Sequence, residues 1–548
     1  MLREAERSLE ERLKSPIGRT TATRFESITT DRFYFWLEDG ILINPFDFVV
    51  VESVENTRTI GMVTSIRSIT DAESHLANII GRKIPEAEQP VERLGGLICE
   101  ATVLRNLGYQ IGRRSVEIRM PVPPDKEVYY ADEEMIRKAV GADLIKGVAI
   151  PAGVTRQTSG ISATIPLDSH YLLGPEGAHA NASGISGLAT KTSYLMFLLL
   201  FLHQKIPKEV ASIIFNVKYS DLLHIREPAS SDEITDEDKE LYETLDLKPV
   251  PFENVRCLLP RAREGKPASY EPPTEHTLYA FELNDVYDEL DLLFSEVPDP
   301  WGTVARFTTG LSRSWRKGAG MSIGLNVVRN WSDLLGIADE NFGEYFGISA
   351  PAPQRIKAEL HRLTRNHVYV NERTPEETYL REEIKKIKAG EIIVVDIFPL
   401  PRETQTFVVG DVMRAIEELY EEAPKTLPRK ILLLIDELNE FAPRGEITSL
   451  SRMIVDIARK GRSRGTILFS AQQFKSQVHD QIHGNCSTHI VGRTGGSELQ
   501  HATYAYLDQS AKQDAMALGL GELIVSFPVW RRPVKGIFPR PPYRIPKR

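Results

Sequence analysis

The residues Asp436-Glu437 directly follow an uninterrupted apolar run, ILLLI (431–435). Such a run is typical of a strand buried on both faces of a parallel sheet, which presents the residues at its carboxyl end at one edge. Asp436 can there order the oxygen shell of a Mg²⁺ ion, and Glu437 can polarise a water for attack on a phosphate. The pattern is that of a Walker B motif. The competing interpretation is a buried strand that ends in a solvated acidic pair.

A second stretch, GISGLATKTSY (184–194), has the residue types of a phosphate-binding loop. Such a loop surrounds phosphates with backbone N–H groups, adds a lysine charge and offers a hydroxyl to Mg²⁺. Six residues rather than five separate Gly184 from Lys191, so we interpret it as a working loop that is one residue longer than the consensus. The alternative is a glycine-containing loop that enters a core helix. The predicted ATP-binding residues are Gly184, Ser186, Gly187, Leu188, Ala189, Thr190, Lys191, Thr192 and Ser193, with Thr192 also on the metal side.

A third candidate is the polar end of the run GTILFSAQQF (465–474). Gln472 or Gln473 could sense the γ-phosphate or orient the attacking water. Taken alone, the pattern equally describes a strand that runs into a polar loop. The order of loop, core helix, strand, acidic strand and glutamine strand is the order that a P-loop motor needs, and this favours the functional interpretation of all three motifs.

A zinc site is a competing use of the stretch VHDQIHGNCSTH (478–489). His479, His483, Cys486 and His489 have spacings that a zinc ion could use. In the fold that we predict, however, the first two lie on a helix and His489 on the following strand. We therefore do not predict zinc.

Several near-continuous apolar runs alternate with amphipathic helical stretches from residue 170 onward. This alternation predicts an α/β nucleotide-binding core with a parallel sheet. It is interrupted by a polar, proline-broken segment, which we interpret as a mostly helical insertion. Short β-rich runs before the core predict a small barrel. The predicted segments are a charged helix at 1–14, the barrel at 15–125, a connector and first core half at 126–226, the insertion at 227–389, the second core half at 390–515 and a brace or tail at 516–548.

Composition is that of a soluble protein with an ordinary core. Of 548 residues, 41% are hydrophobic and 26% charged, and the three cysteines form no CxxC pair, which suits a reducing cytoplasm. The longest apolar run, YLMFLLLFL (194–202), is about half a membrane span. We expect a cytoplasmic protein with no membrane partner. The net charge of −9 disfavours a protein that coats nucleic acid but still permits a ring with a basic channel.

A family resemblance rests on five stretches of the chain. They are DRFYFWLED in the small barrel, LLGPEGAHANASGISGLATKTS, ILLLIDELNEF, IARKGRSRGTILFSAQQ and the terminal LGELIVSFPVWRRPVKGIFPRPPY. With them the sequence resembles the HerA ATPases of the HerA/FtsK class, in which a HAS-barrel precedes a RecA-like P-loop motor. The resemblance covers nearly the whole chain except the insertion.

The resemblance implies a homohexameric ring that hydrolyses ATP with Mg²⁺ between subunits and moves double-stranded DNA through its pore, as a helicase-like translocase. It also implies a protein partner, either a nuclease in end processing or, in phage defence, a sirtuin-type or other effector. Lys191 resembles the P-loop lysine and Thr192 the Mg²⁺ ligand, Asp436 and Glu437 the Walker B pair with Glu437 as catalytic base, Gln472 the sensor, and Arg462 an arginine that acts on the nucleotide.

A second hypothesis is a scaffold rather than a motor. In it the ring binds ATP for structural reasons and assembles an effector enzyme. The acidic balance, the lengthened loop and the lack of a recognised DNA-reading motif favour it. ATPase activity that DNA stimulates distinguishes the motor, whereas activity that is indifferent to DNA distinguishes the scaffold.

Overall fold

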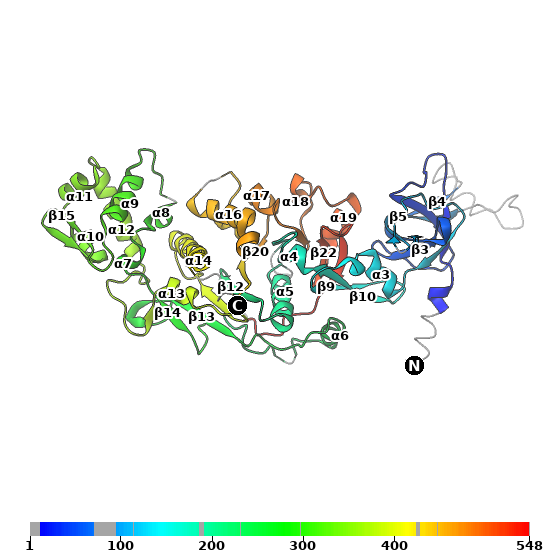
Figure 1. Ribbon diagram of the computed structural model, residues 1–548, viewed down its shortest axis with the longest axis horizontal. Coiled ribbons are helices and arrows are strands. Elements are labelled where there is room, and N and C mark those ends of the chain that lie inside the picture. Colours follow the sequence, from blue (N-terminus) through cyan, green and yellow to red (C-terminus); the bar gives the residue numbers. More distant parts are fainter. Residues whose placement is uncertain are drawn as a thin grey trace, which may run out of the picture. The chain divides into compact units, whose positions relative to one another are not determined.

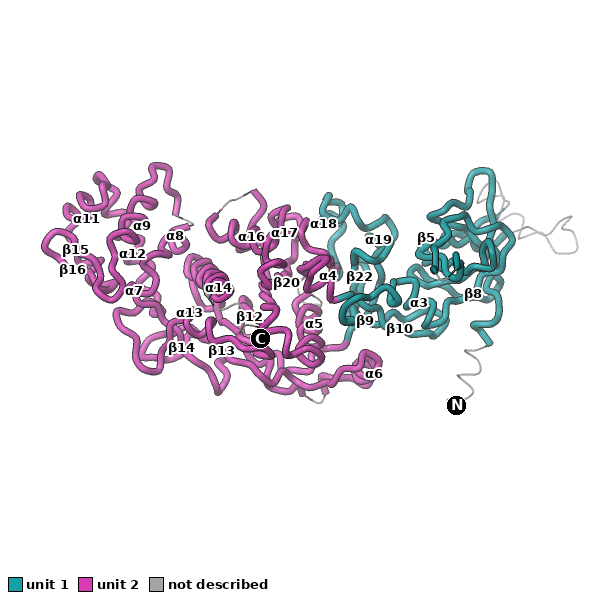
Figure 2. Tube along the Cα trace, viewed as in Figure 1, with its two compact units in different colours: residues 1–168, 491–538 teal, residues 169–490, 539–548 magenta. Residues whose placement is uncertain are grey.

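The computed structural model describes residues 11–70, 95–112, 114–185, 191–230, 232–295, 297–422, 428–445 and 448–546. Two compact units make up the chain (Figure 2). Unit 1 is Met1–Asp168 with Val491–Phe538, and unit 2 is Ser169–Ile490 with Pro539–Arg548. Most of the predicted helix 1–14 lies outside the described residues, and its residues 11–14 are helical. No helix in the described ranges is both long and apolar enough to span a membrane.

A closed barrel forms the first part of unit 1, as the β-rich runs predict. Its interior is apolar, with Phe33, Phe35 and Val49 fully buried. The last strand pairs with both the first and the third, so the barrel extends to residue 130, past the boundary at 125 that we predicted. In order around the barrel, its strands are β1 (Gly18–Thr21), β2 (Arg32–Leu37), β5 (Gly95–Leu107), β4 (Arg58–Thr70), β3 (Phe48–Glu52) and β8 (Glu127–Tyr130).

The rest of unit 1 combines residues from both ends of the chain. An antiparallel group of strands joins β9 (Ala149–Arg156) to β10 (Ser162–Asp168) and to β23 (Val534–Ile537), which also pairs with β22 (Glu522–Ser526). The predicted tail 516–548 is therefore largely extended, and it includes the two strands β22 and β23. Besides residues 11–14, the described part of this unit contains the helices α3 (Glu133–Ala139), α18 (Gly496–Leu499) and α19 (Gln509–Ala517). A short hairpin pairs β6 (Gln110–Ile111) with β7 (Arg114–Ser115).

A parallel sheet forms the centre of unit 2 (Figure 1). Its inner strands are buried on both faces, which explains their unbroken apolar sequences. In spatial order its parallel strands are β11 (Ala180–Ser183), β20 (Thr466–Gln472), β19 (Lys430–Ile435), β12 (Val210–Asn216), β18 (Ile392–Asp396), β13 (Val255–Pro260), β14 (Thr277–Tyr279) and β17 (Glu377–Thr378). Next to β11 in the sheet order is β21 (Thr488–Val491).

Helices pack on this sheet where the sequence predicts them. The apolar run after the candidate phosphate loop forms a helix that is buried along most of its length. A capping box of Thr448 and Ser451 begins α16, and Gly465 ends it with a φ of 84°. A Cβ atom there would lie 2.8 Å from Tyr420 Oη, so the position requires glycine. These helices are α4 (Ser169–Leu172), α5 (Lys191–Lys205), α14 (Arg402–Glu422), α15 (Leu438–Phe441), α16 (Ser449–Arg464) and α17 (Asp480–His483).

The segment 227–389 is only partly the helical insertion that we expected. It contributes β13, β14 and β17 to the sheet, and its side chains Phe281 and Phe307 share one hydrophobic core with Phe215 of β12 and Phe407 of α14. The segment therefore extends the core. Its other elements are α6 (Asp236–Thr244), α7 (Leu283–Val286), α8 (Leu290–Leu293), α9 (Thr303–Ser314), the hairpin of β15 (Met321–Ile323) and β16 (Asn326–Val328), α10 (Trp331–Gly336), α11 (Asp339–Phe346), α12 (Ala352–Thr364) and α13 (Leu380–Lys385).

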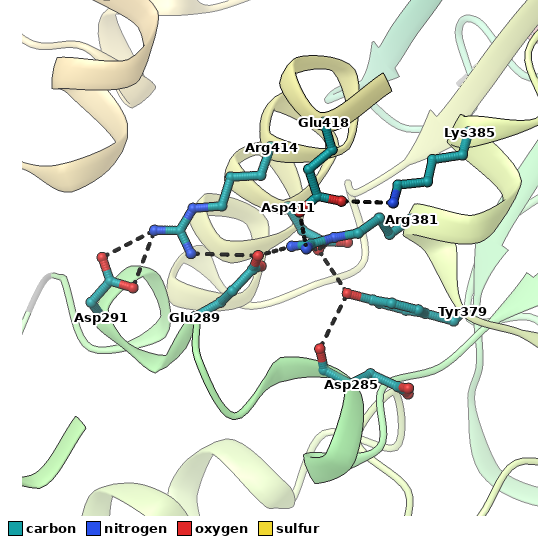
Figure 3. Close-up of polar contacts among 9 residues, drawn as sticks. All are labelled: Asp285, Glu289, Asp291, Tyr379, Arg381, Lys385, Asp411, Arg414 and Glu418. Carbon is teal, nitrogen blue, oxygen red and sulfur yellow. Dashed lines mark hydrogen bonds and ion pairs between the residues drawn. The ribbon is translucent and has the colours of Figure 1, made fainter. Parts of the chain in front are cut away.

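A buried charge network joins this segment to α14 (Figure 3). Arg381 of α13 donates hydrogen bonds of 2.8 Å to Asp411 and to Glu418 on α14 and also pairs with Glu289, which precedes α8. Burial raises the pKa of Asp411, and the charge of Arg381 opposes that shift. Tyr379 adds a hydrogen bond of 3.2 Å to Asp411. The network fixes α13 and the start of α8 against α14.

The last residues of the chain pack on unit 2 itself. The backbone N–H of Arg540 donates to Asp238 of α6, and its carbonyl accepts a hydrogen bond from Tyr242. Arg544 pairs with Glu227 at 2.7 Å, and Tyr543 is buried. The basic, proline-rich end that we interpreted as a brace therefore contacts its own chain.

Candidate nucleotide site

The parallel strands of unit 2 bring the predicted chemical residues to one edge of the sheet. Asp436 and Glu437 follow the last residue of β19, Gln473 follows β20, and Lys218 lies two residues beyond β12. These three strands are adjacent and parallel, so their carboxyl ends meet. Helix α5 begins at Lys191, directly opposite Asp436. Residues distant in the sequence thus form one polar cluster.

Asp436 is held by three donors. The Thr192 hydroxyl donates a hydrogen bond of 2.7 Å to its Oδ2, the Lys218 ammonium lies 2.9 Å from the same oxygen, and the backbone N–H of Glu437 donates to Oδ1 at 2.8 Å. Asp436 is 2% exposed. A hydroxyl and a carboxylate at this separation are oxygen ligands of the kind that Mg²⁺ prefers, directly or through water. This pair fits the predicted metal site.

Glu437 occupies a backbone conformation that few residues adopt. Its φ of 49° and ψ of 48° lie in the left-handed region, which costs a non-glycine residue about 1 kcal/mol or more. The turn directs the side chain toward Lys218, at 2.6 Å, and toward Gln473, at 3.4 Å. The side chain is 17% exposed. A carboxylate that is positioned and still reachable by water suits a general base.

Lys191 is buried with its charge only partly compensated. Its residue is 5% exposed, and within the described part of the chain its ammonium makes no hydrogen bond, although Glu437 Oε1 lies 3.7 Å away. Burial lowers the pKa of Lys191, and the charges of Asp436 and Glu437 oppose this shift. A buried ammonium with free N–H groups is costly unless an acceptor arrives. Phosphate oxygens are such acceptors, so this site fits a nucleotide.

The loop itself is described only at its ends. Ser186, Gly187, Leu188, Ala189 and Thr190 lie outside the described residues. Gly184 has a φ of 153°, which favours glycine, and Ser193 is buried in α5. The role of these seven residues in binding stays a prediction.

The two glutamines differ in what they contact. Gln472 is fully buried and exchanges two amide hydrogen bonds with Asn181 of β11, at 3.0 and 3.1 Å. Its amide is thus engaged away from Glu437. Gln473, one residue further, donates to Glu437. Between the two residues that we considered for the sensor, the geometry favours Gln473 over Gln472.

Arg462 lies at the opposite edge of the sheet. It lies in the last turn of α16, four residues before the start of β20, and its guanidinium donates a hydrogen bond of 2.8 Å to the carbonyl of Glu176. It lies close enough to Lys430, the first residue of β19, to affect the pKa of that ammonium group. The length of that strand, about 17 Å, separates this end from Asp436. Arg462 therefore does not reach the nucleotide site of its own chain, and its predicted action on a nucleotide stays a prediction.

The alternative zinc residues do not come together. No group of three or more metal-ligating side chains is present in the described ranges. His489 contacts Lys475 at 3.1 Å, and Cys486 donates to the carbonyl of Ile482. Burial raises the pKa of the Cys486 thiol to about 12, which disfavours the thiolate that zinc requires.

Sequence reasoning missed Lys218 and Asn181. Lys218 follows a buried apolar strand in the same way as Asp436, so its position was a usable signal. Asn181 gives no such signal, because it is a polar residue inside the short strand β11 and only the pairing with β20 brings it to Gln472.

Comparison with known proteins points in the same direction as the motifs. No family model matches the chain. The DNA double-strand break repair helicase HerA of Pyrococcus furiosus is 26% identical over 174 residues, which cover 26% of this chain and 32% of that protein. Over these residues the chain is similar to HerA. A probable HerA of Methanocaldococcus jannaschii is 26% identical over 134 residues, 24% of this chain and 25% of its own length.

The resemblance to HerA that the motifs indicate is thus confirmed, although the chain spans a third or less of these HerA relatives. Among solved structures, the bacterial conjugative coupling protein TrwB has a TM-score of 0.44 at 12% identity and covers 76% of this chain and 94% of its own. VirB4 of Thermoanaerobacter pseudethanolicus has a TM-score of 0.43 at 14% identity and covers 73% and 97%.

Proposed function

We propose that this chain hydrolyses ATP at the carboxyl edge of its parallel sheet. One observation supports the proposal above the others: Lys191 and Thr192 at the start of α5 meet Asp436 and Glu437 at the end of β19. In that order, the four residues supply one cluster with a charge that binds phosphate, a hydroxyl and a carboxylate that bind the metal, and a base. Lys191 and Thr192 supply the first two, and Asp436 and Glu437 the last two. The HerA relatives are named as helicases, which is consistent with such an activity.

Each residue has a defined task in this proposal. The Lys191 ammonium donates to phosphate oxygens, since among the described residues it makes no hydrogen bond. Thr192 and Asp436 hold Mg²⁺, which when bound neutralises charge on the phosphates. Glu437 accepts a hydrogen bond from the attacking water and draws its proton, while Gln473 holds that carboxylate in place. Positioning and charge account for most of phosphoryl-transfer catalysis, and these residues supply both within one chain.

We propose further that several copies form a ring and that the ring moves double-stranded DNA. Arg462 is exposed and lies at the sheet edge remote from its own site, which is consistent with a role at a neighbour's nucleotide. An arginine given by a neighbour makes activity depend on assembly. The proposal includes six subunits, DNA in the central pore and a nuclease or other effector as partner, with anti-phage defence or DNA end processing as the setting.

The test is the ATPase rate of the full chain with and without linear duplex DNA, together with its mass in solution and the Glu437→Gln variant as control. A hexamer whose Glu437-dependent rate rises with DNA supports the motor. A hexamer with slow turnover that is indifferent to DNA supports the scaffold. If the Glu437→Gln variant hydrolyses ATP like the wild type, the proposed site is wrong.

A further inference from the structure

Lys218 contacts both carboxylates of the candidate site at once. Its ammonium lies 2.9 Å from Asp436 Oδ2 and 2.6 Å from Glu437 Oε1. The turn that carries it is braced, because the buried amide of Asn216 donates 2.7 Å to the carbonyl of Tyr219, a residue with a φ of 39°. The position of Lys218 is thus set by the end of β12. We did not assign it any role from the sequence.

The two lysines of the site are held differently. Lys191 is buried, and in the described residues its ammonium makes no hydrogen bond. Lys218 is fully engaged with the two acids, while its side chain is 27% exposed. A flexible four-carbon stem that reaches solvent can withdraw without disturbing the sheet. Lys191 is therefore ready for an incoming anion, and Lys218 is able to leave.

Lys218 also stands on the side of Asp436 that a metal would use. Both the Thr192 hydroxyl and the Lys218 ammonium converge on the same oxygen, Asp436 Oδ2. An ion held by Thr192 and Asp436 would lie beside the ammonium, and two positive charges at that separation in a partly buried site repel strongly. The ammonium and a divalent cation therefore exclude each other at this carboxylate.

We propose that Lys218 is a positioning residue that neutralises Asp436 and Glu437 in the nucleotide-free site and gives up that place when a divalent cation binds with the nucleotide. The inference rests on the proposed function. Its consequence is a coupling: without nucleotide the cation must compete with Lys218, whereas phosphate charges make the exchange favourable. Glu437 is then released from its pair with Lys218 only in the loaded site.

Cation binding to the full-length protein without nucleotide tests this directly. Mn²⁺ serves as the probe, with free Mn²⁺ measured by electron paramagnetic resonance. Lys218→Met should bind Mn²⁺ at least about tenfold more tightly than the wild type, because a competing charge is gone. Lys218→Arg keeps the charge and should resemble the wild type. Lys205→Met, at an exposed pair with Asp246, is the matched control and should change nothing.

Equal Mn²⁺ affinity in the wild type and Lys218→Met overturns the inference. If Lys218→Met does not fold, Lys218→Gln replaces it, with near-ultraviolet circular dichroism as the check. The ATPase rate of the wild type separates the two proposals. Absence of hydrolysis contradicts the proposed function while the Mn²⁺ comparison still decides the role of Lys218. Normal hydrolysis with unchanged Mn²⁺ affinities contradicts the role of Lys218 alone.

Discussion

The hydroxyl of Thr192 donates a 2.7 Å hydrogen bond to Asp436 Oδ2, across 244 positions of sequence. Thr192 is on the first turn of α5 and Asp436 follows β19, so the bond joins the two motifs that the sequence singles out. A metal-side hydroxyl and a metal-side carboxylate are of use only together. Their contact turns two separate patterns into one site.

Replacing Glu437 by glutamine should slow ATP hydrolysis by about 10²–10⁴-fold, because an amide cannot take the proton of the attacking water. Binding of ATP should survive, since no phosphate contact is removed. Single-turnover hydrolysis and nucleotide retention on a filter measure the two effects. Retained hydrolysis at the normal rate would place the base elsewhere.

Replacing Lys191 by methionine should abolish the stabilisation of the fold by ATP. The apo protein should be no less stable, because the substitution removes a buried ammonium that makes no hydrogen bond in the described structure. Thermal unfolding with and without ATP and Mg²⁺ measures both. An unchanged shift of Tm with ATP contradicts the assignment, and Lys205→Met is the control with an exposed lysine.

Alanine variants of Gln472 and Gln473 should differ in effect, the first lowering stability and the second lowering the rate of ATP turnover. Gln472→Ala leaves Asn181 without its amide partner in a fully buried position, so the free energy of unfolding should fall by about 1–3 kcal/mol. Gln473→Ala removes a contact to Glu437 and should lower turnover roughly tenfold at nearly normal stability. Denaturant unfolding and ATPase rates compare the pair. The reverse pattern would return the sensor to Gln472.

Arg381→Met should lower the free energy of unfolding by about 3–5 kcal/mol, because Asp411 would remain buried without its hydrogen-bonded cation and Glu289 would keep only the longer pair with Arg414. Lys386→Met is the matched control on the same part of the chain. Its side chain is 63% exposed and pairs with Glu383, so less than about 1 kcal/mol should be lost. Equal effects of both variants in urea unfolding would show that the buried network is dispensable.

Asp396 should make stability depend on pH. Burial at the end of β18 raises the pKa of its carboxyl from 3.8 to about 6, despite hydrogen bonds from Ser269 and Asn216. The folded state then binds this proton more tightly than the unfolded state. The resulting stabilisation is full below about pH 4 and is lost as the pH rises through about 6.

Asp396→Asn mimics the protonated form and lacks this dependence. The free energy of unfolding of the wild type and of the variant is measured in urea at pH 4 and at pH 7. Between these two pH values, the variant should gain about 2–3 kcal/mol of stability relative to the wild type. A difference that is the same at both pH values would contradict a raised pKa of Asp396.

By itself the sequence determined the class of fold and the main chemical residues. The short apolar run 431–435 indicates a strand buried on both faces, with Asp436 and Glu437 at its carboxyl edge, whereas the longer apolar run 194–202 lies in helix α5. The alternating runs before residue 125 likewise required a small β-rich domain, which the structure confirms as a closed barrel. Local sequence is enough to predict these elements, because the burial of a strand dictates which residue types it contains.

The tertiary structure decided which of the remaining polar residues meet. Neighbouring residues of a strand point to opposite sides, so one step of register separates Gln472, paired with Asn181, from Gln473, which faces Glu437. Lys218 follows the carboxyl end of β12 and therefore lies in the site. Arg462 lies near the amino end of β20 and is therefore about a strand length away. Strands as short as β14 and β17 are visible only through their neighbours, because their side chains alone carry no pattern.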